Sequence, residues 1–210
     1  MKALTKEAQA RISPTGAIEI LKKGNERFVK NHKADRDLLE QVKDTATGQY
    51  PFATILSCID SRVSAELIFD QGVGDIFSVR VAGNIVNEDL LGSMEFACKL
   101  AGTKVIVVLG HTSCGAVKGA CDDARLGNLT TLLSKIKPAV QAVTEPEDPA
   151  ERTSKNLGFV DHVAEVNVRM TIENIRKQSP VLRILEEDGE IAIVGGMYDI
   201  STGEVRFLDS

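Results

Sequence analysis

Features that mark membrane-spanning, exported and nucleic-acid-binding proteins are missing from this sequence. No apolar run approaches the roughly 18 residues that a membrane span requires. The opening stretch, "MKALTKEAQARISP", contains no apolar segment of the kind found in a secretory signal. The net charge is -5 and no cluster of lysine and arginine is present, which argues against nucleic acid or an anionic membrane as a partner. We therefore expect a cytoplasmic protein, although a mature exported chain that has lost its signal would begin in the same way.

Cysteine is also scarce. The 210 residues include only four cysteines, too few for a disulfide scaffold at this length. In a cytosolic protein, cysteines near histidine or acidic residues more often indicate a metal site or catalysis. The chain has no Gly-Lys-Ser/Thr phosphate loop, and the paired glycines of "GVGDIF" are not followed by the third glycine of a dinucleotide-binding motif. The sequence therefore gives little support to nucleotide binding.

The apolar runs predict a single α/β domain. Four short runs occur, at 52–58, 76–81, 105–109 and 191–194, and the first three are apolar on both faces, as buried parallel strands are. Helical patterns separate them at 88–101, 115–121, 128–143 and 157–178. The C-terminal residues predict a strand, a turn at Thr202-Gly203 and an antiparallel strand. The predicted fold is a mainly parallel central β-sheet flanked by helices, without internal repeats or a linker to a second domain.

The first 50 residues are predicted to form a helical arm and linker, and residues 51–210 to form the α/β core of the same domain. An amphipathic helix is predicted over 15–30. Its apolar face carries Ala17, Ile20, Leu21 and Phe28. That face suits packing on a neighbouring subunit, and it suits packing within one chain equally.

The string "SCIDSRV", residues 57–63, places polar side chains at alternate positions just after an apolar run. In an extended chain Cys58, Asp60 and Arg62 point to the same side, because successive side chains alternate between faces. Aspartate and arginine are rarely buried unless they are paired. This weighs against a simple core position and favours a functional group of side chains.

A second string, "VIVVLGHTSCGAVKGA" at 105–120, brings His111 and Cys114 to the end of another apolar strand. Open α/β sheets bind ligands at the carboxyl ends of their strands. If the two strands are neighbours, Cys58 converges with His111 and Cys114. Two thiolates and an imidazole form a good zinc site, and three protein ligands leave the fourth position that a catalytic zinc needs. Simple burial or a redox pair are the alternatives for the two cysteines.

The remaining cysteines and histidines are predicted to lie outside this site. Cys121 follows Cys114 by seven residues of helix, a rise of about 10.5 Å that is too long for both to share a metal. Cys98 lies beside the apolar face of the 88–101 helix, and free cysteine packs as a small hydrophobe. His32 lies in a polar linker and is expected to be solvated, and His162 lies in the 157–178 helix and is expected at a surface or an interface.

The two cysteine-bearing strings, "CIDSRV" and "GHTSCGAV", resemble those of the β-class carbonic anhydrases. The likeness covers nearly the whole chain and includes "ILKKGNERFV", "RVAGN" at 80–84 and "GMYDISTGEV". It implies a zinc-dependent lyase that reversibly hydrates carbon dioxide to bicarbonate, with one zinc ion per chain. It further implies Cys58, His111 and Cys114 as zinc ligands, with Asp60 and Arg62 as a dyad beside them. Asp60 is also an alternative metal ligand, in a state where it fills the open position and stops turnover.

General chemistry gives the residues of this implied site their roles. Zinc lowers the pKa of water to about 7, so that hydroxide is available at neutral pH to attack carbon dioxide. Arg62 keeps Asp60 ionised through a charge-assisted pair. The fixed carboxylate then accepts the hydrogen of the hydroxide and aims its lone pair at carbon.

Finer resemblances suggest a substrate pocket and an assembly. Gln49, nine residues before Cys58, resembles the plant-type branch, in which a glutamine there lines the pocket. Phe77 and Ala82 would align with the apolar wall that faces it, and Gly115 is assigned to the same pocket. The chain has no tryptophan and so departs from the branch with a tryptophan-flanked bicarbonate site, which argues against regulation by bicarbonate. The family forms dimers and higher multiples, so a homodimer or homotetramer is predicted.

Two other functions stay open at this point. A hydrolase of carbon disulfide or carbonyl sulfide has a similar scaffold, and the shape of the pocket decides the substrate. A non-catalytic zinc or redox-binding protein is the other alternative. The presence of both Asp60 and Arg62 counts against it, because structural zinc needs neither.

Overall fold

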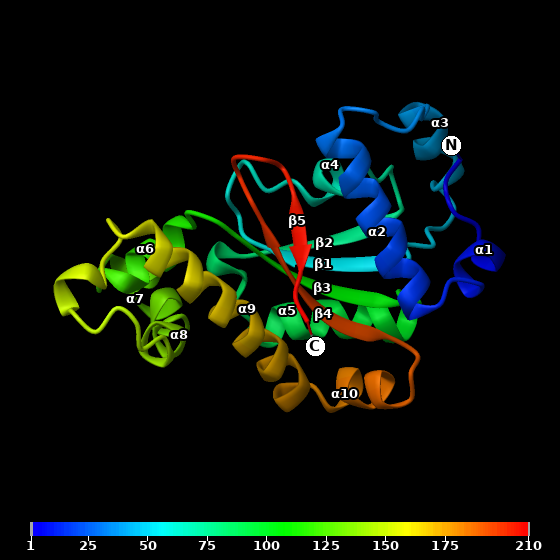
Figure 1. Cartoon of the computed structure of the whole chain (residues 1–210). Coiled ribbons are helices and arrows are strands. Elements are labelled where there is room, and N and C mark those ends of the chain that lie inside the picture. The colour runs from blue at the N-terminus through cyan, green and yellow to red at the C-terminus, as the bar shows by residue number, and fades with distance from the viewer. Residues whose placement is uncertain (1, 210) are drawn as a thin grey trace.

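The computed structural model describes residues 2–209, and this part of the chain contains a five-stranded sheet in the order β2-β1-β3-β4-β5 (Figure 1). The parallel strands are β1 (Ala53–Ser57), β2 (Ile76–Arg80), β3 (Val105–His111) and β4 (Ala192–Tyr198). The last strand, β5 (Val205–Phe207), is antiparallel to β4. Every residue of β1 and β3 is buried, as expected for central strands covered on both faces. The predicted α/β fold is confirmed.

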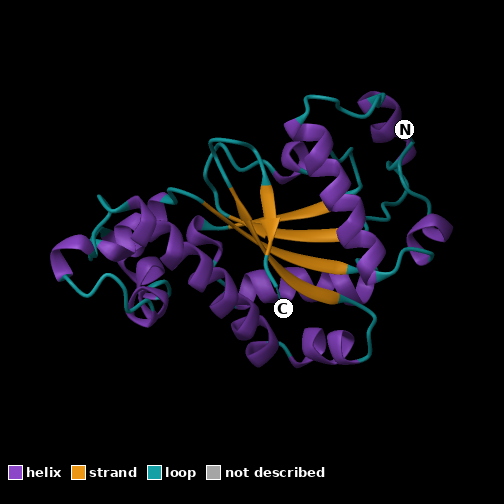
Figure 2. Cartoon of the chain, viewed as in Figure 1, coloured by secondary structure: helices purple, strands orange, loops and turns teal. Residues whose placement is uncertain are grey.

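Helices lie on both sides of the sheet (Figure 2). The α-helices are α1 (Lys6–Ala10), α2 (Pro14–Val29), α3 (Leu38–Asp44), α4 (Ala65–Ile68), α5 (Glu88–Glu95), α6 (Gly115–Cys121), α7 (Gly127–Ser134), α8 (Lys137–Ala142), α9 (Leu157–Gln178) and α10 (Pro180–Glu187). Short 3-10 helices are η1 (Ala82–Asn84) and η3 (Pro149–Glu151), and a π-helix, η2 (Phe96–Leu100), directly follows α5. Among residues 2–209, no helix is both long and apolar enough to cross a membrane.

One face of the sheet is covered by the N-terminal helix α2. Val105, Val107 and Leu109 of β3 pack in one cluster with Ala17 and Leu21 of α2, and all five are fully buried. Burying a leucine side chain stabilises a fold by about 1.5–3 kcal/mol. Of the two packing modes that the sequence left open for this helix, packing within one chain is therefore the one observed.

The opposite face is covered largely by α9, together with α5 and α10 (Figure 1). The alternate side chains Ile106 and Val108 of β3 share a cluster with Val160, Val163 and Val168 of α9. The valine spacing in the 157–178 segment thus places these side chains against this face of the sheet.

The strand register brings the candidate ligands to one edge of the sheet. Ser57 lies opposite Arg80 of β2 and Leu109 of β3, so Cys58 leaves β1 beside the ends of both neighbours. Gly110 lets α9 approach this edge closely, because a Cβ atom there would lie 2.6 Å from Val168. The end of β3 and the side of α9 are therefore held in direct contact.

Candidate metal centre

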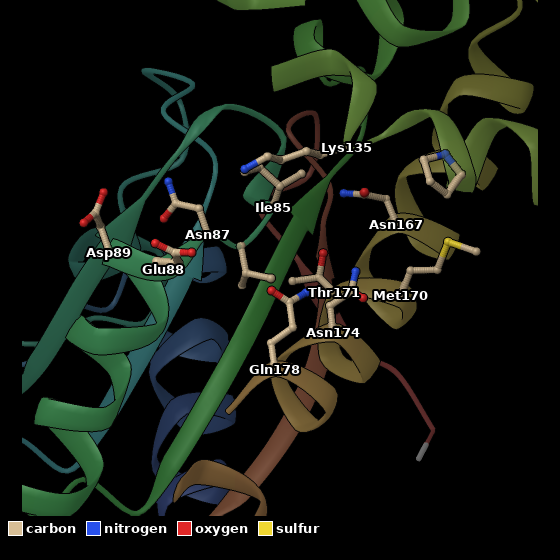
Figure 3. Close-up of a pocket in the computed structure, with 12 residues that line it drawn as sticks. Ile85, Asn87, Glu88, Asp89, Lys135, Asn167, Met170, Thr171, Asn174 and Gln178 are labelled. Carbon is tan, nitrogen blue, oxygen red and sulfur yellow. The ribbon is translucent and has the colours of Figure 1, made fainter. Parts of the chain in front are cut away.

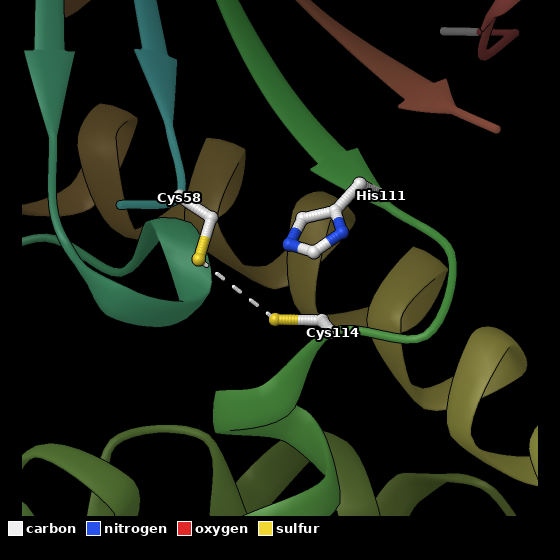
Figure 4. A group of neighbouring side chains, drawn as sticks. All are labelled: Cys58, His111 and Cys114. Carbon is white, nitrogen blue, oxygen red and sulfur yellow. Dashed lines mark hydrogen bonds between the residues drawn. The ribbon is translucent and has the colours of Figure 1, made fainter. Parts of the chain in front are cut away.

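Three buried side chains converge where β1 and β3 end (Figure 4). Cys58 follows β1, His111 is the last residue of β3, and Cys114 directly precedes α6. Their ligand atoms all lie within 4.8 Å of one another, and the two sulfur atoms are 4.0 Å apart. The structure thus brings together the three side chains that the sequence pointed to.

The histidine ring of this group is oriented for a metal. Nδ1 of His111 donates a hydrogen bond to the carbonyl oxygen of Thr112 at 2.9 Å, which leaves Nε2 with a free lone pair. Nε2 is buried and has no hydrogen-bond partner among the described residues. Leaving such an atom unsatisfied costs about 1–3 kcal/mol, so a ligand for it is expected. Two sulfurs and one imidazole nitrogen fit zinc, with one coordination position left over.

The sulfur atoms of Cys58 and Cys114 are close enough to form a hydrogen bond with each other. A hydrogen bond from Cys114, with a further one from the amide of Gly83, lowers the pKa of Cys58 despite its burial. The same pairing with Cys58, added to burial, raises the pKa of Cys114. A divalent cation bound here would favour the deprotonated form of both thiols.

Asp60 and Arg62 form a two-pronged ion pair beside this group. Nε and Nη2 of Arg62 donate to the two carboxylate oxygens of Asp60 at 2.9 and 2.7 Å, and the Arg62 amide adds a bond of 3.0 Å. The hydrogen bond from the Arg62 side chain holds the pKa of Asp60 well below its usual range. Asp60 is therefore ionised and turned toward Arg62, outside the ligand group. The alternative in which Asp60 ligates the metal requires this pair to separate.

Arg80, at the end of β2, is a site residue that sequence reasoning missed. Its Nε and Nη2 atoms donate to the carbonyl oxygens of Cys58 and Asp60, at 3.0 and 2.7 Å. It thereby holds the backbone that carries both side chains. A signal did exist: an arginine ends the strand that follows the Cys58 string, and neighbouring parallel strands end together.

The predicted substrate-binding residues fall into two groups. Ala82 lies beside Gly83, whose amide donates to the Cys58 sulfur at 3.4 Å, and Gly115 directly follows Cys114. Gln49 is exposed and precedes β1, at the amino ends of the strands. Phe77 lies in the first half of β2, with its ring 6.3 Å from that of Phe96.

Gln49 and Phe77 thus lie away from the ligand edge of their own chain. Ala82 and Gly115 lie next to it. The substrate-binding role of all four residues stays a prediction.

The other cysteines and histidines lie outside the centre, as expected. Cys98 and Cys121 are buried in the core, and burial raises the pKa of each thiol to about 11. Both therefore stay neutral and pack as small apolar groups. His32 and His162 are exposed.

Comparison with known proteins agrees with this geometry. A family model described as carbonic anhydrase matches residues 53–205. "Carbonic anhydrase 2" of Mycobacterium tuberculosis is 36% identical over 198 residues, covering 94% of this chain and 94% of that protein. The chain belongs to the carbonic anhydrase family. It is an enzyme, a lyase that catalyses the reversible hydration of carbon dioxide, and a non-catalytic binding protein is set aside.

Solved structures assign this carbonic anhydrase to the β class. One of the two tetrameric β-carbonic anhydrases of Sordaria macrospora superposes with a TM-score of 0.69 and 27% identity, covering 80% of this chain and 85% of that one. The β-carbonic anhydrase CafA of Aspergillus fumigatus gives 0.68 and 26%, covering 93% and 90%. The resemblance drawn from the two cysteine-bearing strings is confirmed.

Proposed function

We propose that this carbonic anhydrase works with one zinc ion per chain, held by Cys58, His111 and Cys114. The observation that carries the proposal is the buried group of two sulfur atoms and one unpartnered imidazole nitrogen. A zinc ion bound there supplies Lewis-acid activation of water, lowering the pKa of water to about 7 so that hydroxide is available at neutral pH.

Asp60 and Arg62 orient the nucleophile in this proposal. The Asp60 carboxylate can only accept hydrogen bonds, because its pKa is held low by Arg62. It accepts the hydrogen of the attacking oxygen and so directs a lone pair at the carbon of carbon dioxide. Arg62 keeps the carboxylate turned away from the metal ligands. Arg80 fixes the backbone of this turn.

The proposed working unit is a homodimer or homotetramer of single-domain chains, each domain spanning residues 1–210. The structural relative from Sordaria macrospora is tetrameric. Gln49 and Phe77 lie away from the metal ligands of their own chain, so a substrate-binding role for them requires a second subunit. Such a pocket, shared between subunits and closed by Ala82 and Gly115, corresponds to the plant-type resemblance of the sequence.

A reducing compartment suits these side chains. All four cysteines are free, and the two closest sulfurs, 4.0 Å apart, are not bonded to each other. Metal-binding thiolates would be lost if this pair were oxidised. We place the enzyme in the cytoplasm on this ground.

The test is a pair of cysteine variants. Cys114→Ser should lose zinc and carbon dioxide hydration together, because a hydroxyl is a far poorer zinc ligand than a thiolate. Cys121→Ser, at the far end of the helix that Cys114 precedes and outside the ligand group, is the matched control and should keep both. Zinc content is measured by elemental analysis and turnover by stopped flow with a pH indicator. Full zinc occupancy in Cys114→Ser contradicts the ligand assignment.

The substrate is tested in the same instrument. Carbonyl sulfide and carbon disulfide replace carbon dioxide under identical buffer and enzyme concentration. We expect turnover with carbon dioxide to exceed turnover with either sulfur analogue. The reverse order would identify the chain as a hydrolase of those analogues.

A further inference from the structure

Helix α9 contacts both loops that carry the metal ligands. Nδ2 of Asn167 donates to the carbonyl oxygen of Gly83 at 2.8 Å, in a buried hydrogen bond. Six residues earlier on the same helix, Oδ1 of Asp161 accepts a hydrogen bond from the amide of Ser113 at 2.6 Å. Gly83 contacts Cys58, and Ser113 lies between His111 and Cys114. Two polar side chains of one helix thus bind the backbone of the two loops that carry the three ligands.

The Asn167 contact bears on the Cys58 sulfur. The amide of Gly83 donates to that sulfur at 3.4 Å, and a hydrogen bond of this kind stabilises a thiolate and fixes its direction. Gly83 has a φ of +70°, and a Cβ atom there would lie 2.4 Å from Ile136. The turn at Gly83 is therefore in close contact with Ile136 and hydrogen-bonded to Asn167.

The Asp161 contact bears on the loop between the other two ligands. Ser113 has a φ of +55°, in the left-handed region, where a residue with a side chain carries a strain of about 1–3 kcal/mol. Such a conformation persists only when its surroundings hold it. The carboxylate of Asp161 does so through a short, charge-assisted bond to the Ser113 amide.

Packing of the helix does not require these side chains. The buried surface of α9 is mostly apolar, with valines, isoleucines, Phe159 and Ala164, and Asn167 is 3% exposed among them. An amide buried there is costly unless it is hydrogen-bonded, and the bond to the Gly83 carbonyl meets this need. Asn167 belongs to a polar row that lines a cavity of about 560 Å³, with Thr171, Asn174 and Gln178 (Figure 3). Of these, Asn174 and Gln178 are exposed, and within residues 2–209 neither forms a hydrogen bond to a ligand loop.

We propose that Asn167 and Asp161 are positioning residues of the metal centre, which hold Cys58, His111 and Cys114 in place for the metal before it binds. This rests on the zinc site proposed above. Neither residue touches the metal; each acts through the backbone of a ligand loop. Replacement of such supporting groups typically lowers metal affinity by about 10- to 100-fold.

The experiment compares zinc affinity across matched variants, by competition with a chromophoric chelator. Asn167→Ala and Asp161→Ala should each bind zinc about 10- to 100-fold more weakly than the unmodified protein. Asp161→Asn keeps an acceptor oxygen and should restore most of the affinity. Asn174→Ala, on the same helix, is the control and should leave affinity unchanged. Absorption spectra of the cobalt-substituted proteins give a second readout, because the sulfur-to-cobalt band reports the geometry at Cys58 and Cys114.

The outcomes separate this inference from the proposed function. If the unmodified protein binds no zinc, the proposed function fails. If it binds zinc and both alanine variants bind it equally tightly, with unchanged cobalt spectra, the helix is only a structural support and the inference is wrong. If Asn167→Ala does not fold, Asn167→Asp takes its place, since it keeps the size of the side chain and puts a second acceptor against the Gly83 carbonyl. Asn167→Asp should show the same loss of zinc affinity as Asn167→Ala.

Discussion

At the scale of single residues, both the carboxylate and the backbone carbonyl of Asp60 accept hydrogen bonds from arginines. Both of its oxygens accept hydrogen bonds from Arg62, and its backbone carbonyl accepts one from Arg80. An exposed ion pair contributes little to stability, typically under about 1 kcal/mol. The arrangement therefore serves orientation of the carboxylate more than stability of the fold.

The first prediction concerns this pair. Arg62→Ala should lower turnover by about 100-fold, because the carboxylate loses its fixed direction or moves onto the metal. Asp60→Asn should have a similar effect, since an amide can present a donor where an acceptor is needed. Zinc content should stay unchanged in both variants. The double variant should cost less than the sum of the single ones, because the two residues act as a unit.

The measurement is turnover and zinc content under one buffer and pH, with Arg183→Ala as control. Arg183 is an exposed arginine whose partner within residues 2–209 is Glu187 on the same helix, so its loss should not affect turnover. Wild-type turnover in Arg62→Ala would show that the pair is merely structural.

At the scale of elements, an ion network ties the end of α2 to the end of α4. The carboxylate of Asp70, 6% exposed, pairs with Arg27 of α2 at 2.5 Å and with Arg36 at 2.7 Å. Burial alone would raise the pKa of Asp70, but hydrogen bonds from Arg27, the Ala34 amide and Arg36 outweigh it and lower the pKa. Ionised Asp70 thus holds α2 and the following linker onto the core.

Asp70→Asn should lower the free energy of unfolding at neutral pH by about 3 kcal/mol, because two arginines lose their partner. The pKa of Asp70 is lower folded than unfolded, so its contribution is complete at neutral pH. It is lost only as pH falls below the unfolded value of about 3.9 and through the folded pKa. Urea unfolding should therefore show a constant difference from pH 7 to about pH 5 that narrows below about pH 4.

The control for this prediction is Glu26→Gln. Glu26 forms an exposed pair with Lys30 at 4.0 Å, and its loss should change stability by less than about 1 kcal/mol. A difference between Asp70→Asn and wild type that persists unchanged at low pH would mean that the charge of Asp70 is not what stabilises α2.

Elements differ in how far the sequence alone predicts them. The predicted helices at 115–121 and 157–178 coincide with α6 and α9, and Asn156 caps the second of them. The predicted helix at 128–143 is split into α7 and α8, because Pro138 lacks an amide hydrogen to continue the first helix. Helices α3 and α10 were missed, although Asp37 and Ser179 cap them and offered a signal.

The candidate metal centre also has a part that the sequence predicts and a part that it does not, and the difference has a physical cause. The grouping of Cys58, His111 and Cys114 was predictable because each lies at or just after the end of an apolar strand, and parallel strands end together. The supporting contacts of Asn167 and Asp161 were not, because they join segments 84 and 48 residues apart. No local pattern encodes a hydrogen bond between a helix side chain and a distant loop amide.

At the scale of the whole molecule, the open edge of the sheet is where a second subunit is expected. β2 is an edge strand, and its outer side offers unpaired amide and carbonyl groups. Phe77 of β2 lies against Phe96, which is 52% exposed, and Leu100 on the same helical turn is 75% exposed. Exposed apolar side chains beside an open strand mark an association surface. Helix α2 no longer supports this argument, since its apolar face is used within the chain.

The last prediction is that the enzyme is a homodimer or homotetramer whose contact includes this edge. Light scattering at micromolar concentration should report a multiple of 22.7 kDa. Leu100→Glu should shift the protein toward 22.7 kDa, because a carboxylate would be buried without a partner in the contact. Leu126→Glu is the control, since Leu126 is 72% exposed but lies between α6 and α7, and it should leave the mass unchanged. If Gln49 and Phe77 serve the pocket of a neighbouring subunit, activity should fall together with the mass in Leu100→Glu. A fully active species of 22.7 kDa would contradict both the assembly and the shared pocket.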